Sequence, residues 1–185
     1  MKIKNIIWKG LHYNSIENCV INVGAKSINI DSSIIGYIDN AIYKVDYTIH
    51  ADTDWNTISF GIKSKVNGIT NQISGQKIGN LWKIDGDYQD GLANCTDIDI
   101  SLTPFTNSLP INRLHLNQNQ QMVIDVLYIN ILEHKIMGVQ QKYTRLAEKK
   151  YHYQNIENDF ESVIEVDNDG FVIDYPRLFE RGAII

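Results

Sequence analysis

Cysteine is scarce in this sequence, with Cys19 and Cys95 the only two among 185 residues. A secreted domain held together by disulfides would usually carry more, so we expect both to be reduced, partly buried thiols. The opening segment MKIKNIIWKG contains no apolar run of signal-peptide length, and no run elsewhere approaches the length of a membrane span. These absences predict a cytoplasmic protein without a membrane span.

Positive charge is also in short supply. The chain has 17 Lys and Arg against 22 Asp and Glu, which gives a net charge of -5. Because nucleic acid binding needs a basic face, nucleic acid is not expected as the partner. No Pro/Ser-rich linker, charge block or repeat divides the chain, and its length fits one domain. We therefore expect a single domain over residues 1–185.

The familiar catalytic and metal-binding motifs are missing. No two of the five histidines stand four residues apart, and neither cysteine belongs to a C-x-x-C pair, so neither a metal site nor a cofactor is predicted. The patterns G-x-S-x-G and S-x-x-K and the phosphate-binding glycine motifs are absent as well. No catalytic residue is therefore predicted from a motif.

Alternation of apolar and polar residues is the main signal that is present. It is clear in IYKVDYTIH (residues 42–50), TISFGIK (57–63) and DIDISL (97–102), and it predicts strands with one solvated face. Asn67-Gly68 and Asp85-Gly86 indicate hairpin turns, and DNDG (167–170) a third near the C-terminus. In all we expect about ten strands. Helical periodicity is weak, and a short helix is expected only around residues 146–151.

This pattern predicts a mainly β fold. Consecutive antiparallel strands must hide their edges by closing, curling or being capped. We therefore expect a single curled antiparallel sheet that forms a half-barrel or β-roll, with a concave face and few short helices. An edge strand left exposed could pair with a second copy in a homodimer.

Aspartates occur in four Asp-x-Asp pairs. Three of the pairs fall at expected turns, at residues 52–54, 85–87 and 167–169, where Asp favours local hydrogen bonds. Asp97 and Asp99 instead alternate with apolar residues in an expected strand, and a solvated outer face is the favoured interpretation. A hydrolase that uses Asp97 and Asp99, or Asp174, for acid-base work on a sugar or an ester is an alternative hypothesis.

Proline occurs only three times, and two of the three lie in the stretch TPFTNSLP (103–110), where they bracket five residues. Because proline cannot donate to a sheet, Pro104 and Pro110 are expected to end the strand at residues 97–102 and to delay the next one until about Ile111. The segment between them would be a rigid crossing, with Phe105 tucked inward and Arg113 projecting from the following strand.

The same stretch carries a family resemblance. DIDISLTPFTNSLPINRL resembles the signature of the putative glycolipid-binding family of bacterial proteins, and WKGLHYNSIENCVI, LWKIDG, QQKYTRL and FVIDYPRLFER resemble its other segments in order and spacing. The resemblance covers nearly the whole chain. The chain departs from the family pattern at Asn112-Arg113, where the family has two arginines. The family is similar in fold to the periplasmic lipoprotein carriers, which implies a half-barrel with an apolar concave face.

The resemblance implies noncatalytic binding of an amphipathic ligand, such as a glycolipid or an acyl-chain molecule. Aromatic side chains would form part of the wall, arginines would donate to a sugar or a phosphate, and amides would orient the ligand. The candidates are Phe105, Tyr143, Trp55 and Trp82 for the wall, Arg113 and Arg145 as donors, and Asn107 and Gln141 as amides. In a third hypothesis the domain is structural or serves in assembly, and the two arginines only pair with Asp97 and Asp99.

Overall fold

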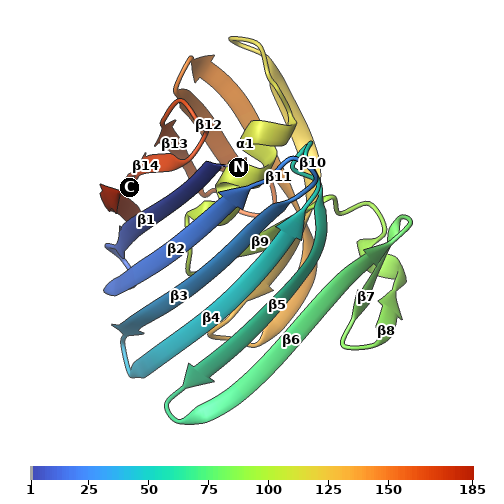
Figure 1. Cartoon of the computed structure of the whole chain (residues 1–185), viewed down its shortest axis with the longest axis vertical. Helices are drawn as coiled ribbons and strands as arrows, with labels where there is room; N and C mark the ends of the chain where they lie inside the picture. The colour runs from blue at the N-terminus through green and yellow to red at the C-terminus, as the bar shows by residue number, and fades with distance from the viewer. Residues whose placement is uncertain (1) are drawn as a thin grey trace.

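The computed structural model describes residues 2–185 and arranges them as one large curled sheet (Figure 1). The first half of the chain contributes β1 (Lys2–Gly10), β2 (Ser15–Val23), β3 (Ile28–Ile38), β4 (Ala41–Ala51), β5 (Thr57–Val66), β6 (Ile69–Ile78), β7 (Leu81–Ile84) and β8 (Asp87–Gln89). The second half contributes β9 (Asp97–Ile100), β10 (Gln121–Asn130), β11 (Lys135–Ala147), β12 (Lys150–Asn155), β13 (Glu161–Val166), β14 (Val172–Tyr175) and β15 (Phe179–Ile184). The short helices are η1 (Asp90–Leu92), η2 (Phe105–Asn107) and α1 (Ser108–Arg113).

The sheet runs without interruption from β8 through β1, then through β15 to β9. Neighbouring strands are antiparallel, except that β9 and β10 are parallel. The sheet is not closed, because its two end strands, β8 and β9, do not pair with each other, and both are very short, which limits the exposed edge. The predicted mainly β fold with a curled antiparallel sheet is confirmed, although the described residues form fifteen strands rather than about ten.

The predicted hairpins form where the turn residues indicated them. Asn67 and Gly68 have φ angles of 47° and 87° between β5 and β6, and Asp85 and Gly86 have 48° and 100° between β7 and β8. Two consecutive positive φ angles are the requirement of a tight hairpin turn that matches the sheet twist. These turns fix the register, and with it the face of the sheet on which each side chain lies.

The curl brings the second half of the sheet behind the first half, and two cores result (Figure 1). The larger core packs side chains of β1–β7 against β9, β10 and the segment that follows β9. The smaller core packs α1 against β10–β15. Strand β9 contributes to both, because Ile98 and Ile100 belong to the larger core, while Asp97 and Asp99 contact groups of α1, η2 and β11 beside the smaller one.

Pro104 and Pro110 lie in a helical segment, so the expectation that the next strand begins at about Ile111 was wrong. Pro104 caps η2, and Pro110 lies in the first turn of α1, where a backbone N–H has no helical partner to lose. A parallel pair needs a crossover connection, which is usually helical, and this segment supplies the one between β9 and β10. Arg113 therefore projects from the last turn of α1 and not from a strand.

The expectation of a short helix around residues 146–151 was also wrong. Leu146 belongs to β11 and Tyr151 to β12, and a turn joins these two antiparallel strands. Their antiparallel pairing satisfies backbone groups that a helix would have bonded locally. Within residues 2–185, none of the helices is long and apolar enough to cross a membrane.

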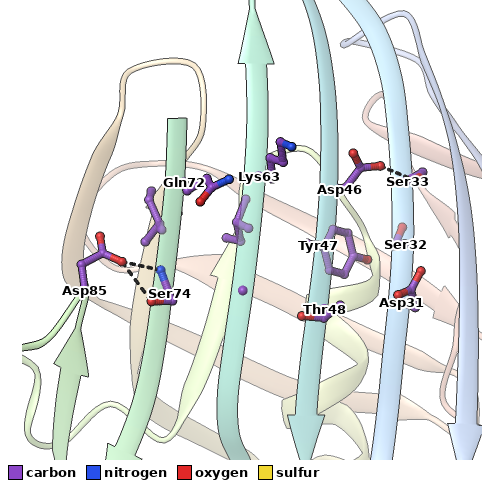
Figure 2. Close-up of a pocket in the computed structure, with 13 residues that line it drawn as sticks. Asp31, Ser32, Ser33, Asp46, Tyr47, Thr48, Lys63, Gln72, Ser74 and Asp85 are labelled. Carbon is purple, nitrogen blue, oxygen red and sulfur yellow. Dashed lines mark hydrogen bonds between the residues drawn. The ribbon is translucent and has the colours of Figure 1, made fainter. Parts of the chain in front are cut away.

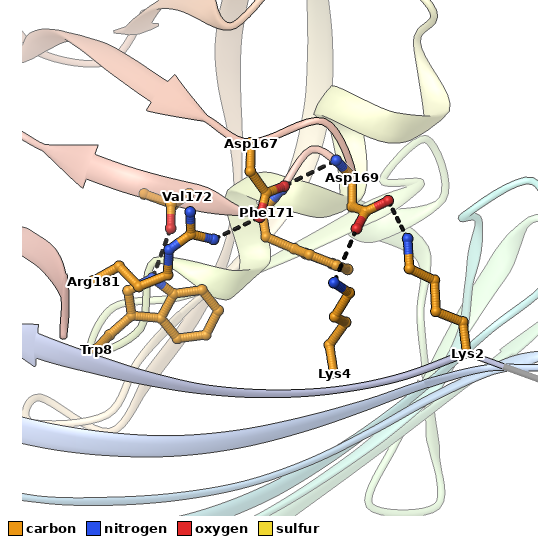
Figure 3. A network of polar contacts seen from close by, with 8 residues as sticks. All are labelled: Lys2, Lys4, Trp8, Asp167, Asp169, Phe171, Val172 and Arg181. Carbon is orange, nitrogen blue, oxygen red and sulfur yellow. Dashed lines mark hydrogen bonds and ion pairs between the residues drawn. The ribbon is translucent and has the colours of Figure 1, made fainter. Parts of the chain in front are cut away.

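Polar contacts fasten β1 to the turn between β13 and β14 (Figure 3). Asp167 accepts the backbone N–H groups of Asp169 and Phe171, as expected of turn chemistry, and an ion pair of 2.6 Å joins it to Arg181. Asp169 in turn pairs with Lys2 and Lys4 of β1. The first strand is thereby held to the C-terminal half by side chains as well as by its pairing with β15.

Candidate functional site

A cavity of about 560 Å³ opens on the inner face of the C-terminal half of the sheet. The loop after β1, strands β9, β10, β12 and β14, and η2 all contribute to its wall. Its aromatic lining consists of Tyr13, Tyr128, Tyr153, Phe160, Tyr175 and Phe179. Its polar lining includes His12, Asp99, Ser101, Thr103, Asn107, Asn155, Asn158 and Arg177. A concave site with aromatic walls and a few polar groups is the usual form of a small-molecule binding site.

Asp99 is the acidic group of this cavity. One carboxylate oxygen accepts the Thr106 hydroxyl at 3.0 Å, and the other accepts the Gln141 side-chain amide at 2.7 Å. Burial raises the pKa of Asp99, and these two hydrogen bonds oppose the increase. Its position on β9, next to the crossover, lets one carboxylate contact both η2 and β11.

A second set of hydrogen bonds fixes Asn107 at the cavity wall. The Tyr143 hydroxyl donates to Asn107 Oδ1 at 2.9 Å and lies 3.3 Å from Gln141 Oε1. Asn107 also donates to the Pro104 carbonyl. Three of the residues predicted from the sequence, Asn107, Gln141 and Tyr143, are therefore brought together around Asp99, with Asn107 in direct contact with the cavity.

The tyrosines of the cavity are held by ring packing. Tyr153, Phe160 and Tyr175 contact one another with ring centroids 6.1–6.3 Å apart, and Phe179 extends the cluster to Tyr13. Burial raises the pKa of Tyr128 to about 12, and the Asp99 carboxylate adds to the increase. Burial and Asp99 also raise the pKa of Tyr153. These hydroxyls therefore stay neutral and able to donate.

Asp97 is not on a solvated face, and the expectation for this pair was wrong. Asp97 is 0% exposed and forms a two-point contact with Arg113, with Nε 3.1 Å from Oδ1 and Nη2 2.5 Å from Oδ2. Burial raises the pKa of Asp97, and the Arg113 guanidinium opposes it. Strand alternation failed as a guide because β9 is covered on both faces, which a four-residue pattern cannot reveal.

The remaining predicted residues lie away from the cavity wall or are engaged by protein groups. Arg145 donates to the backbone carbonyls of Leu116, Ala147 and Glu148, and not to Asp99. Phe105 and Trp82 are both 0% exposed in the larger core. Trp55 is half-buried, and its ring packs on Phe171.

Glu17 is a buried acid that the sequence analysis did not single out. It is 2% exposed, and Oε1 accepts hydroxyls of Tyr47 at 2.6 Å, Ser32 at 2.7 Å and Thr103 at 2.9 Å. Burial raises its pKa to about 7, against the effect of these hydrogen bonds. The signal was available, because alternation in SIENCVI puts Glu17 on the same face as Cys19.

A second cavity of about 560 Å³ spans strands β3–β6 (Figure 2). Gly61 lines it, opposite Thr48 on one neighbouring strand and Ser74 on the other, and contributes no side chain to fill the space between them. Two of its three carboxylates are already engaged, since Asp85 accepts from Ser74 and Asp46 accepts from Ser33. This cavity is more open and nearly free of aromatic rings, and it is a weaker candidate for a binding site.

Neither cavity has the ligands of a metal centre. In the part of the chain that the structure describes, no group of three or more His, Cys, Asp or Glu could hold a metal ion. Both cysteines are free and buried.

Comparisons with known proteins give one family model and one solved structure. The family model described as "Putative glycolipid-binding" matches residues 5–181. A solved structure of a DUF1089 family protein from Pseudomonas aeruginosa superposes with a TM-score of 0.78 at 30% sequence identity, covering 89% of this chain and 91% of that one. No curated protein gives a significant match. The chain therefore belongs to the putative glycolipid-binding family.

Proposed function

We propose that this protein binds an amphipathic ligand such as a glycolipid, without catalysis, and that the polar head of the ligand occupies the cavity around Asp99. The family description supports a binding role. The cavity volume falls within the range of small-molecule sites, and its lining combines apolar rings with a few polar groups. Sugars suit such a lining, because their ring faces pack on aromatic side chains while their hydroxyls need hydrogen-bonding partners.

The observation that carries the proposal is a set of tyrosines that line the same cavity as one carboxylate. Tyr128, Tyr153 and Tyr175 line the cavity together with Asp99, and burial keeps their hydroxyls protonated. If these tyrosines served only to pack the core, phenylalanine would serve equally well at their positions. A hydroxyl at the wall of a cavity is useful where a polar ligand enters it.

The predicted binding residues take different parts in this proposal. Asn107 contacts the head group, while Gln141 and Tyr143 position Asp99 and Asn107. Arg113 and Arg145 contribute to the wall architecture, because their donors already serve Asp97 and backbone carbonyls. The aromatic residues predicted for the wall, Phe105, Trp55 and Trp82, would support the cavity from the larger core.

The hydrolase hypothesis has less support than binding. A glycosidase of the common kind needs two carboxyl groups that flank the scissile bond. Asp97 is fully buried and ion-paired, which leaves Asp99 as the accessible member of that pair. Asp174 lies on β14 opposite Glu165 and Glu180, two residues of like charge on the neighbouring strands.

Location and assembly complete the proposal. Free buried thiols at Cys19 and Cys95 suit a reducing compartment, which favours the cytoplasm. The excess of acidic residues argues against a nucleic acid partner. The open end of the sheet at β8 is where a homodimer could form by strand pairing.

Native mass spectrometry of freshly purified protein tests the proposal, followed by titration with n-octyl β-D-glucopyranoside below its micelle concentration. We expect a bound or added amphiphile on the wild-type protein and weaker binding by Tyr153→Phe, which keeps the ring and removes one hydroxyl. Tyr37→Phe is the matched control, because Tyr37 is exposed on β3. Absence of any bound amphiphile, or equal loss in both variants, would contradict the proposal.

A further inference from the structure

We propose that the head group bound at Asp99 carries a protonated amine, as an amino sugar does. This inference rests on the proposed function and narrows it from an amphipathic ligand to a cationic one. Three observations support it: the Asp99 carboxylate lines the cavity, its hydrogen-bond partners are neutral, and the cavity has aromatic walls.

The carboxylate of Asp99 has neutral partners. Thr106 and Gln141 each donate one hydrogen bond, one to either oxygen, and each oxygen keeps a further acceptor position. Among residues 2–185, the ion pairs within 4.0 Å do not include Asp99. The neighbouring Asp97, by contrast, has the guanidinium of Arg113 as its partner. Partial removal of a carboxylate from water is costly unless a cation compensates it, so the half-buried Asp99 offers a negative charge for a ligand to neutralise.

The basic groups at the cavity do not remove this charge. His12 and Arg177 line the cavity, but both side chains are exposed to solvent, where water screens them. Asp99 lies deeper, beside η2 and the inner face of β11. An anionic head group such as a phosphate would therefore be repelled by the Asp99 carboxylate inside the cavity. At the entrance it would interact only weakly with the solvent-screened side chains of His12 and Arg177.

The aromatic walls favour a cation as well. Ring faces attract ammonium groups, most strongly where water is displaced, and Tyr128, Tyr153 and Tyr175 line the same cavity as Asp99. Burial and then the Asp99 carboxylate raise the pKa of Tyr128 and Tyr153, and burial, Tyr153 and then Asp99 raise the pKa of Tyr175. An ammonium bound beside Asp99 would meet a carboxylate and the rings in a poorly solvated site, where both attractions are strong.

A matched pair of soluble amphiphiles tests the inference. The probes are n-octyl 2-amino-2-deoxy-β-D-glucopyranoside and n-octyl β-D-glucopyranoside, which differ only in the amine, titrated at about pH 6, where an amine is charged. A charge-assisted contact should make wild-type protein bind the amine roughly tenfold or more tightly. Asp99→Asn should bind both probes alike. Asp174→Asn, an aspartate on β14 outside the cavity lining, should keep the preference.

Each outcome decides a different question. Equal affinity of the two probes for wild-type protein, or a preference retained in Asp99→Asn, would overturn the amine inference and leave the proposed function standing. Binding of neither probe would overturn both. If Asp99→Asn does not fold, the wild-type protein supplies the readout by carboxyl-carbon NMR, because the amine should lower the pKa of Asp99 whereas the neutral glucoside should not. An unchanged titration with saturating amine would refute the inference.

Discussion

The Thr103 hydroxyl donates to Oε1 of Glu17 at 2.9 Å and so joins the crossover after β9 to strand β2. The next polar residues of the same motif act in parallel. Thr106 donates to Asp99, and Asn107 accepts from Tyr143. The segment TPFTN therefore holds two carboxyl groups, the buried Glu17 of β2 and the half-buried Asp99 of β9, and this explains its polar residues in structural terms.

Glu17 should make the stability of the fold depend on pH. Its pKa is raised from an ordinary 4.5 to about 7, so the folded state binds a proton that the unfolded state releases. Glu17 therefore makes its full contribution to the free energy of unfolding below about pH 4.5. That contribution, roughly 3 kcal/mol, is lost as the pH rises toward 7. Glu17→Gln, which resembles the protonated acid, should flatten this part of the profile.

Urea unfolding of both proteins from about pH 5 to pH 8 measures the effect, because the difference between their profiles cancels other titrating groups. Asp97 and Asp99 also have raised pKa values and act in the same direction, whereas the pKa of Asp46 is lowered and acts in the opposite one. Parallel profiles for wild type and Glu17→Gln would show that Glu17 titrates normally.

Arg113→Ala should destabilise the fold strongly. It leaves the fully buried Asp97 carboxylate without its cation, and breaking a buried pair in this way costs about 3–5 kcal/mol. Chemical denaturation at neutral pH measures the loss. Lys9→Ala is the control, because its pair with Glu180 is exposed and should contribute less than about 1 kcal/mol. A stable Arg113→Ala protein with weakened amphiphile binding would instead assign Arg113 to the ligand.

Local sequence signals predicted the parts of the fold that depend on local physics. Alternation and the turn pair Asn67-Gly68 located strands and hairpins correctly, because period and positive φ are properties of a few neighbouring residues. The helix from Ser108 to Arg113 was not predicted, because Pro110 was interpreted as a sheet breaker although proline also fits the first turn of a helix. The parallel partner of β9 could not be found, because it comes from a strand about twenty residues later.

The site was predictable only in part. The resemblance located Asn107, Gln141 and Tyr143, which do meet in space. Asp99 was noticed but assigned to solvent, because the sequence of β9 alternates as a half-exposed strand does, although both faces of β9 are covered. The tyrosines of β10, β12 and β14 come together only through the curl of the sheet, and such long-range proximity has no signature in a single sequence.

Thr106→Val should test how the crossover positions Asp99. Valine matches threonine in shape, so the change removes the donor to Asp99 Oδ1 and the acceptor for the Ile100 N–H with little change in packing. Unsatisfied buried groups cost about 1–3 kcal/mol, and we expect a loss of this size in urea unfolding. Thr70→Val, at an exposed position on β6, should change stability by less than about 0.5 kcal/mol.

The Thr106→Val variant should also change the titration of Asp99. With one hydrogen bond fewer to its charged form, Asp99 should titrate at a higher pH in carboxyl-carbon NMR, because donors to a carboxylate lower its pKa. A variant as stable as wild type, with Asp99 titrating unchanged, would show that Gln141 alone holds the carboxylate and that the threonine is dispensable.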